Sequence, residues 1–217
     1  MTQYERMQKG LIFDTCDPEV QKIQQQYQQK LFEFNQLSPI QIEEKKARFK
    51  ELFAECGENN WIEGPIRATW GCSHVHLGNR IYANVNLTLV DDGHIYIADR
   101  VLIGPNVTIA TANHPLEPTL RRYEMEYVRD VHIGENTWIG SGAIILPGVS
   151  IGKNCVIGAG SIVTRDIPDN SLSYGNPCHI AREIGEYDRE YYYKTDKIDW
   201  DNLQEQVDKK REKWGEK

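Results

Sequence analysis

The chain has 217 residues, of which 40% are hydrophobic and 26% charged, and its formal net charge is -7 at pH 7. These values are ordinary for a globular protein of one domain with appendages. The acidic charge argues against general nucleic-acid binding, which needs a basic surface, and no apolar stretch approaches the length that spans a bilayer.

Residues 1–57 are polar and show the spacing of amphipathic helices. Asp14 and Asp17 both suit the N-cap of a first helix, with Pro18 in its first turn. Apolar positions then recur at spacings of three and four: Val20, Ile23, Tyr27, Leu31 and Phe34. Ser38-Pro39 is expected to open a second helix. Because such stripes need an apolar partner, we expect both helices to lie against the strands that follow.

Short strands are predicted from Trp61 onward. Apolar residues are spaced by six at Leu77, Ala83 and Leu89, and again at Ile97, Ile103 and Ile109. Between the two series the phase slips by two residues, near the turn sequence 91–93, Asp-Asp-Gly. The first coils are therefore expected to be irregular.

Residues 112–131 interrupt the pattern with two prolines and seven charged residues. Such a segment cannot line a dry core, and a long loop inside a compact repeat is usually functional. We predict an arm that leaves the repeat after Thr111 and rejoins it at Ile133.

The segment 133–168 reads as six consecutive hexads, each opened by an aliphatic residue. The leading residues are Ile133, Ile139, Ile145, Ile151, Ile157 and Val163. Six residues suit one short strand and a tight corner, so three hexads would close a triangular coil of 18 residues around these side chains. Strands of successive coils would pair at about 4.8 Å. We predict a mainly β fold, a parallel β-helix of stacked coils.

The C-terminal part is charged and aromatic, and Leu203 and Val207 make a weak apolar stripe for a terminal helix. We expect three segments: a helical one at 1–57, the repeat at 58–184 and a charged helical tail at 185–217.

The hexads resemble the hexapeptide-repeat acyltransferases, and the resemblance implies a left-handed parallel β-helix. The N-terminal segment through Phe34-Asn35 and the sequence T-A-N-H-P around His114 are similar to the maltose and galactoside acetyltransferases. The resemblance covers about residues 4–184. It implies transfer of an acetyl group from acetyl-CoA, as co-substrate, to a hydroxyl of a sugar or similar polyol.

His114 opens the arm, at the kind of polar excursion from a rigid scaffold where catalytic groups gather. An imidazole suits the removal of a hydroxyl proton at neutral pH, and the resemblance implies that His114 is the general base. The acceptor oxygen would attack the thioester directly, without an acyl-enzyme. The resemblance places the oxyanion donor at the main-chain N–H of Ser141, where Gly140 and Gly142 allow close approach of a ligand.

Ser141 and Ala159 lie 18 residues apart, so they occupy equivalent places on successive coils, along which a linear pantetheine arm can run. The resemblance places the cofactor along Trp138, Ser141, Gly142, Ala159, Thr164 and Arg165, and its nucleotide end near Asn176, His179 and Arg182. The arginines supply positive charge that the acidic chain otherwise lacks. His179 stands where close relatives carry an arginine.

For the acceptor, the resemblance implies contacts from Tyr82, Asn84 and Asp92, and from Glu126 on the arm, which would touch the substrate or His114. Asp14 and Asp17 are alternatives for an N-terminal acceptor-binding carboxylate. Gln24 replaces an arginine of the galactoside enzymes, which argues against a preference for galactosides.

We expect a homotrimer with active sites at subunit boundaries, without nucleic-acid or membrane partners and without a metal. The first ten residues lack the apolar core of a signal peptide, and the five cysteines form no CxxC motif. Free thiols of this kind indicate the cytoplasm.

Other functions on the same coil are a serine or xenobiotic O-acetyltransferase, a metal enzyme like the γ-carbonic anhydrases, and a non-catalytic β-helix subunit. The metal reading has weak support, because His74-x-His76 is a poor ligand pair and the arm separates His114 from His132. A non-catalytic subunit would be expected to lack His114.

Overall fold

A computed structural model describes residues 1–38 and 40–215. The chain divides into two compact units, residues 1–183 and 184–217, which are described separately.

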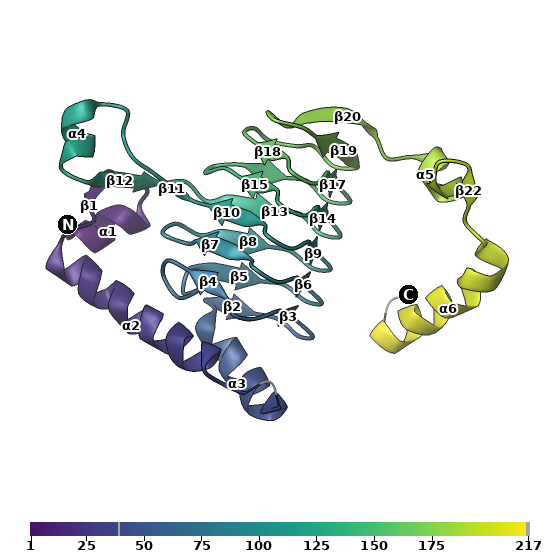
Figure 1. The fold of residues 1–217 in the computed structure, drawn as a ribbon, viewed down its shortest axis with the longest axis horizontal. Coiled ribbons are helices and arrows are strands. Elements are labelled where there is room, and N and C mark those ends of the chain that lie inside the picture. The colour runs from purple at the N-terminus through teal and green to yellow at the C-terminus, as the bar shows by residue number, and fades with distance from the viewer. Residues whose placement is uncertain (39, 216–217) are drawn as a thin grey trace. The chain divides into compact units, whose positions relative to one another are not determined.

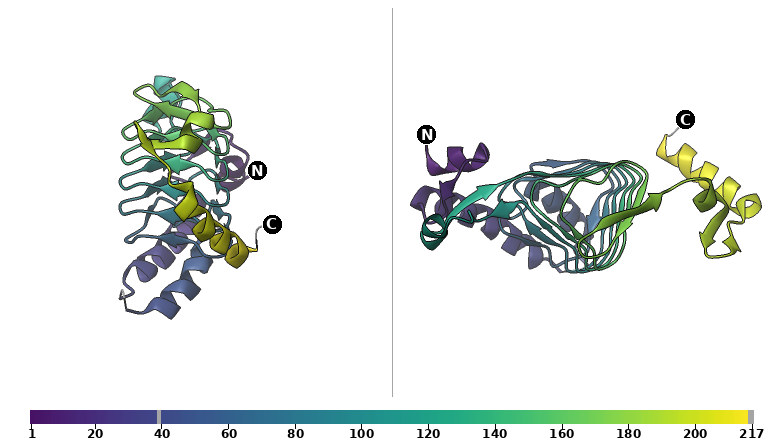
Figure 2. Two further views of the ribbon diagram at one scale, coloured as in Figure 1. Left: turned by 90° about the vertical axis from the view of Figure 1, so that its right-hand side faces the viewer. Right: turned by 90° about the horizontal axis from the view of Figure 1, so that it is seen from above.

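The first unit is built on a parallel β-helix, whose stacked coils are drawn in Figure 1 and from two further sides in Figure 2. Each coil contributes one short strand to each of three sheets. The β7 sheet contains β4 (Arg67–Ala68), β7 (Thr88–Val90), β10 (Thr108–Ala110), β15 (Ile144–Ile145) and β18 (Ile162–Val163). The β8 sheet contains β2 (Glu55–Cys56), β5 (Val75–Leu77), β8 (Ile95–Ile97), β13 (Val131–Ile133) and β16 (Ser150–Ile151). The β6 sheet contains β3 (Trp61–Ile62), β6 (Tyr82–Ala83), β9 (Leu102–Ile103), β14 (Trp138–Ile139), β17 (Val156–Ile157), β19 (Ser171–Tyr174) and β20 (His179–Glu183).

The six leading aliphatic residues of the hexads, from Ile133 to Val163, are at most 3% exposed, which confirms the predicted inward face. The pairing also confirms the phase slip. Leu77 pairs with Ile97, an interval of 20 residues, whereas Ile133 pairs with Ile151, an interval of 18. Coil corners are made by asparagines with positive φ, whose amides also bond between coils: Asn86 to Asn106, Asn136 to Asn154 and Asn154 to Asn170.

The arm is a small structured element rather than a plain loop. Strands β11 (Ala112–Asn113) and β12 (Met125–Val128) form an antiparallel sheet with β1 (Phe13–Asp14), and α4 (Pro118–Arg122) lies between β11 and β12 in the chain. The chain rejoins the coil at Val131, two residues before the predicted Ile133, because Val131 is fully buried and pairs with Ile95.

Three N-terminal helices pack on this scaffold: α1 (Gln3–Gln8), α2 (Pro18–Asn35) and α3 (Ile42–Leu52). Asp17 caps α2, and Leu31 and Phe34 of that helix join the coil core, as expected. A second apolar cluster ties α1 and α2 to the arm through Met7, Phe13, Val20, Trp70 and Val128. Helix α3 begins at Ile42, later than the predicted Ser38-Pro39, and Pro39 lies outside the described residues.

The second unit contains α5 (Glu186–Glu190), the hairpin of β21 (Tyr191–Tyr193) and β22 (Asp196–Lys197), and α6 (Trp200–Trp214). The predicted terminal helix is thus present. Leu203 and Val207 on α6 remain about two-fifths exposed. Within 1–38 and 40–215, no helix has the length and apolar character needed to cross a membrane.

Candidate active site

His114 follows β11 directly, and its ring orientation is fixed by the returning strand of the arm. Its Nδ1 lies 2.9 Å from the main-chain oxygen of Met125 on β12. A carbonyl oxygen only accepts hydrogen bonds, so Nδ1 carries the proton. In the neutral ring Nε2 then presents a lone pair, and nearly half of the side chain is open to solvent. This is the tautomer that a general base at Nε2 requires.

Glu126, also on β12, places a buried carboxyl group beside this ring. Its Oε2 lies 3.9 Å from His114 Nε2, too far for a hydrogen bond, and its Oε1 is buried without a hydrogen-bond partner within the described residues. Burial, and secondly the charge of Asp92, raise the pKa of Glu126 to about 8. The carboxyl is therefore neutral at pH 7, and the pair with His114 is not an ion pair in the resting site.

Asp92 is held at the end of β7 by two donors. Its Oδ1 accepts from Trp70 Nε1 (2.8 Å) and its Oδ2 from Thr69 Oγ1 (2.9 Å). The preceding residue, Asp91, is fully buried and accepts the main-chain N–H of Trp70 at 2.7 Å. Burial raises the pKa of Asp92, and the charge of His114 lowers it.

The two alternative N-terminal carboxylates occupy different places. Asp14 lies on β1, paired with Met125, so it shares the small sheet with the residues that flank His114. Asp17 instead accepts the main-chain N–H groups of Glu19 and Val20 as the N-cap of α2. Asp14 Oδ1 likewise accepts a main-chain N–H, that of Cys16, at 2.8 Å, so the difference between the two residues is that Asp14 lies on the strand beside Met125.

Two of the predicted cofactor positions, Ser141 and Ala159, lie at the starts of strands of the β7 sheet, at the opposite strand ends from His114. Ser141 and Ala159 are exposed, and both precede strands of that sheet, β15 and β18. The N–H of Ser141 donates to no acceptor in the described part of the chain, whereas its carbonyl accepts from Gly160 at 2.8 Å. Gly142 has φ +70°, and a Cβ built there would meet nothing within 4 Å, so a ligand can approach the main chain at this turn.

Near the last coil, Arg165, Asn176 and His179 line one hollow of about 400 Å³. Thr164, which precedes Arg165, is exposed, and Arg182 lies on β20, paired with Leu172. The hollow therefore gathers the residues predicted for the nucleotide end of the cofactor, apart from Arg182.

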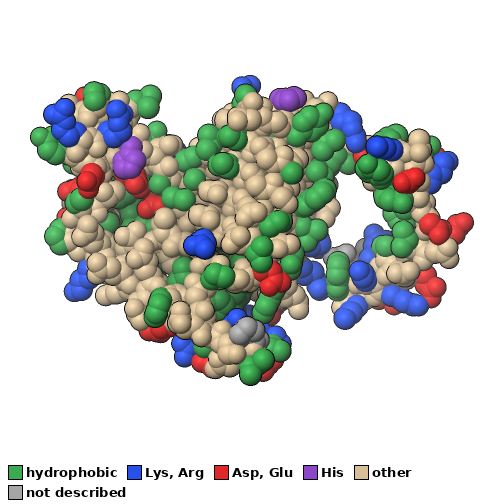
Figure 3. All heavy atoms as spheres, viewed as in Figure 1, with side chains coloured by type: hydrophobic (Ala, Val, Ile, Leu, Met, Phe, Trp, Pro, Cys, Tyr) green, Lys and Arg blue, Asp and Glu red, His purple; other side chains and the backbone are tan. Residues whose placement is uncertain are grey.

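Three other predicted residues lie near the starts of the β7-sheet strands, with Ser141, and not near the arm: Tyr82, Asn84 and Trp138. Tyr82 and Trp138 point outward from the β6 sheet, each in register with Leu102, and Asn84 follows β6. Figure 3 shows hydrophobic side chains along the edge of the coil that carries β6, β9 and β14, and acidic side chains beside a histidine below α4. The outward column consists of Trp61, Tyr82, Leu102 and Trp138, which are 38%, 39%, 50% and 52% exposed.

The predicted site residues thus form two groups. Asp14, Asp92, His114 and Glu126 lie where the strands of the β7 sheet end, whereas Asn84, Ser141 and Ala159 lie where those strands begin. Strands of three residues span about 10 Å, and the turns add to this distance. The structure therefore does not bring the two groups together within one chain.

Sequence reasoning missed Met125, whose main-chain oxygen fixes His114. No residue type marks such a role, and only the pairing of β11 with β12 reveals it.

In the described residues no group of three or more His, Cys, Asp or Glu side chains is arranged to hold a metal ion.

The chain is similar to several known proteins. Residues 130–165 match the family model for the bacterial transferase hexapeptide (six repeats), and residues 6–57 match that for the maltose acetyltransferase hexapeptide capping motif. The galactoside O-acetyltransferase of Lactococcus lactis is 46% identical over 92% of this chain and 97% of its own length. That of Escherichia coli is 44% identical over 92% and 98%.

Solved structures show the same likeness. A galactoside acetyltransferase in complex with coenzyme A superposes with a TM-score of 0.87, at 43% identity, over 92% of this chain and 99% of its own. A hexapeptide-repeat acetyltransferase of Vibrio cholerae complexed with acetyl coenzyme A has a TM-score of 0.78 at 31% identity, over 86% of this chain and 100% of its own.

Proposed function

Because this chain belongs to the family of maltose and galactoside O-acetyltransferases, and is thus an acetyl-CoA-dependent acyltransferase, we propose that it acetylates a hydroxyl group of a sugar or similar polyol with His114 as general base. The observation that carries the proposal is the fixed tautomer of His114. Its Nδ1 donates to Met125 O, so Nε2 is free to receive a proton.

In the proposed reaction, the acceptor hydroxyl gives its proton to His114 Nε2 as its oxygen bonds to the thioester carbon. The carbonyl oxygen becomes an oxyanion, for which the unoccupied N–H of Ser141 is a donor fixed in advance. When the tetrahedral species collapses, the C–S bond breaks, and the imidazolium returns its proton to the CoA thiolate. The acetyl ester and free CoA leave, and the base is restored.

Three carboxyl groups of different character surround the ring on the arm side, which suits an acceptor with several hydroxyls. Asp92 is anchored by Trp70 and Thr69, and Asp14 lies on the neighbouring strand. Glu126, kept neutral by burial, can donate a hydrogen bond to a sugar oxygen from Oε2, the carboxyl oxygen on the side of His114. A polyol can pair with donors and acceptors at once.

The acceptor class is tested with a panel assayed by release of free thiol from acetyl-CoA. Maltose, a galactoside, free monosaccharides, serine and chloramphenicol would be compared at equal concentration. We expect kcat/KM to be highest for a sugar. A higher value for serine or chloramphenicol would replace the sugar assignment by the corresponding alternative.

We further propose that two chains build each site, within a homotrimer. The base and the cofactor turns lie at opposite ends of the strands of the β7 sheet, so a neighbouring copy has to supply the second group. Cyclic assemblies repeat one interface around an axis, which would place the arm of each chain beside the cofactor turns of the next.

Mixing two inactive variants tests this arrangement. His114→Ala lacks the base, and Ala159→Trp fills an exposed turn on the cofactor side; each variant alone is expected to be inactive. When the two are co-expressed at equal levels, about a quarter of the interfaces combine an intact base with an intact wall, so activity should return to that fraction. A mixture as inactive as its components would show that each site lies within one chain.

A further inference from the structure

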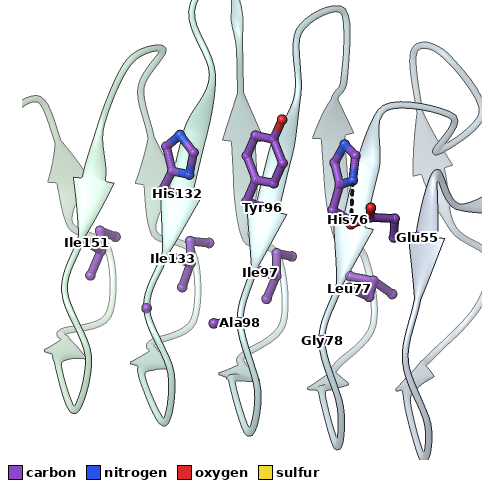
Figure 4. Close-up of a pocket in the computed structure, with 11 residues that line it drawn as sticks. Glu55, His76, Leu77, Gly78, Tyr96, Ile97, Ala98, His132, Ile133 and Ile151 are labelled. Carbon is purple, nitrogen blue, oxygen red and sulfur yellow. Dashed lines mark hydrogen bonds and ion pairs between the residues drawn. The ribbon is translucent and has the colours of Figure 1, made fainter.

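A series of hydrogen-bonded side chains runs from Glu55, on the surface of the coil, to the main-chain oxygen of Asp91, the residue before Asp92. Three imidazoles take part: His74 and His76 lie next to and on β5, and His94 directly precedes β8 on the adjacent coil. Their neighbouring contacts are Glu55 Oε2 to His76 Nδ1 (3.0 Å), His76 Nε2 to His94 Nδ1 (2.9 Å), His94 Nε2 to Gln8 Oε1 (3.3 Å), Gln8 Nε2 to His74 Nε2 (3.2 Å), and His74 Nδ1 to Asp91 O (2.7 Å). Figure 4 shows the outer end, with Glu55 bonded to His76 and with Tyr96 and His132 in line on the same sheet.

The protonation of each ring follows from these partners, starting at the buried end. The carbonyl of Asp91 only accepts, so His74 carries its proton on Nδ1 and accepts on Nε2. The Gln8 amide nitrogen donates to that Nε2, which leaves the amide oxygen to accept from His94 Nε2. His94 is then protonated on Nε2 and accepts on Nδ1 from His76 Nε2.

At the outer end this order leaves His76 between two acceptors. Its Nε2 must donate to His94, and its Nδ1 faces the carboxylate of Glu55. Both ring nitrogens of His76 therefore carry a proton, so the three histidines together hold one proton more than they would if all three rings were neutral. Reversing the Gln8 amide would instead require a second proton on His74, the most buried of the three rings.

The surroundings agree with a proton on the outermost ring. Burial lowers the pKa of His94 and lowers that of His74 to about 4, although the Asp130 carboxylate acts in the opposite direction on both. Lys9 and Arg129 line the same hollow as His94 and add positive charge there. His76 has the carboxylate of Glu55 at hydrogen-bond distance, and Tyr96 stacks on its ring at 4.4 Å.

We propose that Glu55, the three histidines and Gln8 form one positioning device, which holds a proton on His76 and steadies the acceptor-site carboxylate of Asp92 through the main chain of Asp91. The mechanical link is short. His74 holds the carbonyl of Asp91, and the next residue is Asp92. Thr69 Oγ1 lies within hydrogen-bond distance of both carboxyl groups, at 3.2 Å from Asp91 Oδ1 and 2.9 Å from Asp92 Oδ2. The role of Asp92 rests on the function proposed above, whereas the protonation of the chain does not.

The device makes acceptor binding depend on the carboxylate at its outer end. When Glu55 is replaced by alanine, His76 Nδ1 loses its acceptor, and the restraint that the hydrogen-bonded series places on the Asp91 carbonyl weakens. We expect the KM for the acceptor to rise by about 2- to 10-fold, the scale of one hydrogen bond. The KM for acetyl-CoA should stay constant, because the cofactor turns lie at the opposite ends of the strands.

Glu55→Gln is the informative variant. Its amide can donate to the Nδ1 of a neutral His76, so the chain is satisfied without the extra proton. The acceptor KM should therefore rise for Glu55→Ala and stay at the wild-type value for Glu55→Gln. Glu58→Gln, a nearby exposed glutamate paired with Lys50, should follow the wild type. An acceptor KM that is unchanged in Glu55→Ala would overturn the proposal.

A direct readout separates this proposal from the proposed reaction. Neutron diffraction on the wild-type protein at neutral pH should place hydrogen on both nitrogens of His76, on Nδ1 of His74 and on Nε2 of His94. A neutral His76, or a proton on Nε2 of His74, would contradict the chain even if sugars are acetylated. If the expected protons are found but no sugar is acetylated, the function proposed above fails and the protonated chain stands.

Discussion

Replacing His114 by alanine is expected to lower kcat for acetyl transfer by about 10²- to 10⁴-fold, the usual contribution of a general base. The ring is half exposed on the arm, and its one hydrogen bond within the described residues is to Met125 O, so the coil loses no packing. Thiol release under saturating acetyl-CoA and acceptor measures the effect. Circular dichroism and the oligomeric mass should match those of the wild type.

His132→Ala is the matched control for this variant. His132 is also an exposed histidine next to the arm in sequence, but it lies on β13 of the β8 sheet and stacks on Tyr96. Its loss should leave kcat within about 2-fold of the wild type, as for surface substitutions that cost less than 0.5 kcal/mol. If His114→Ala also retained near-normal turnover, the base would have to be another group.

Replacing Glu126 by glutamine is expected to stabilise the protein, and to do so only at neutral and alkaline pH. Burial raises the pKa of this carboxyl from 4.5 to about 8 in the folded state. The protonated form is therefore favoured by folding. Its contribution is complete below pH 4.5 and is lost as the pH rises through 8. Between these two pH limits the free energy of unfolding falls by about 5 kcal/mol, because each unit of pKa shift corresponds to 1.36 kcal/mol.

Glutamine resembles the neutral acid and does not ionise. Glu126→Gln should unfold with the same denaturant midpoint as the wild type at pH 4.5 and with a clearly higher midpoint at pH 9. Glu51→Gln, on the exposed part of α3, supplies a control that should show no difference at either pH. A destabilised Glu126→Gln protein at pH 9 would mean that the carboxylate is ionised and paired in the fold.

The repeat could be predicted from the sequence because its signal is periodic. Residues such as Ile139 and Ile157 each mark an inward position, and the slip between Leu89 and Ile97 correctly indicated a longer coil. The arm was recognisable from its prolines and charges. Its return at Val131 was not, because Val131 stands outside the six-residue phase that begins at Ile133.

Contacts between distant segments left no local signal. Strand β1 pairs with β12 across more than a hundred residues, and neither strand has a distinctive sequence. The placement of Asp14 beside the arm, and not at a helix cap, depends on that pairing. The histidine chain was equally hidden, although His76 and Tyr96 are separated by the same 20 residues as Leu77 and Ile97.

In the proposed site, the base and the cofactor turns lie at opposite ends of the same strands, so a change at one end need not disturb the other. The length of the groove is counted in whole coils, and one coil more or less would change it by a single strand spacing, about 4.8 Å. The arm, by contrast, interrupts the repeat at one point and can be exchanged without disturbing the register of any inward residue. In this fold the acceptor contacts on the arm can thus change while the spacing of the cofactor turns stays the same.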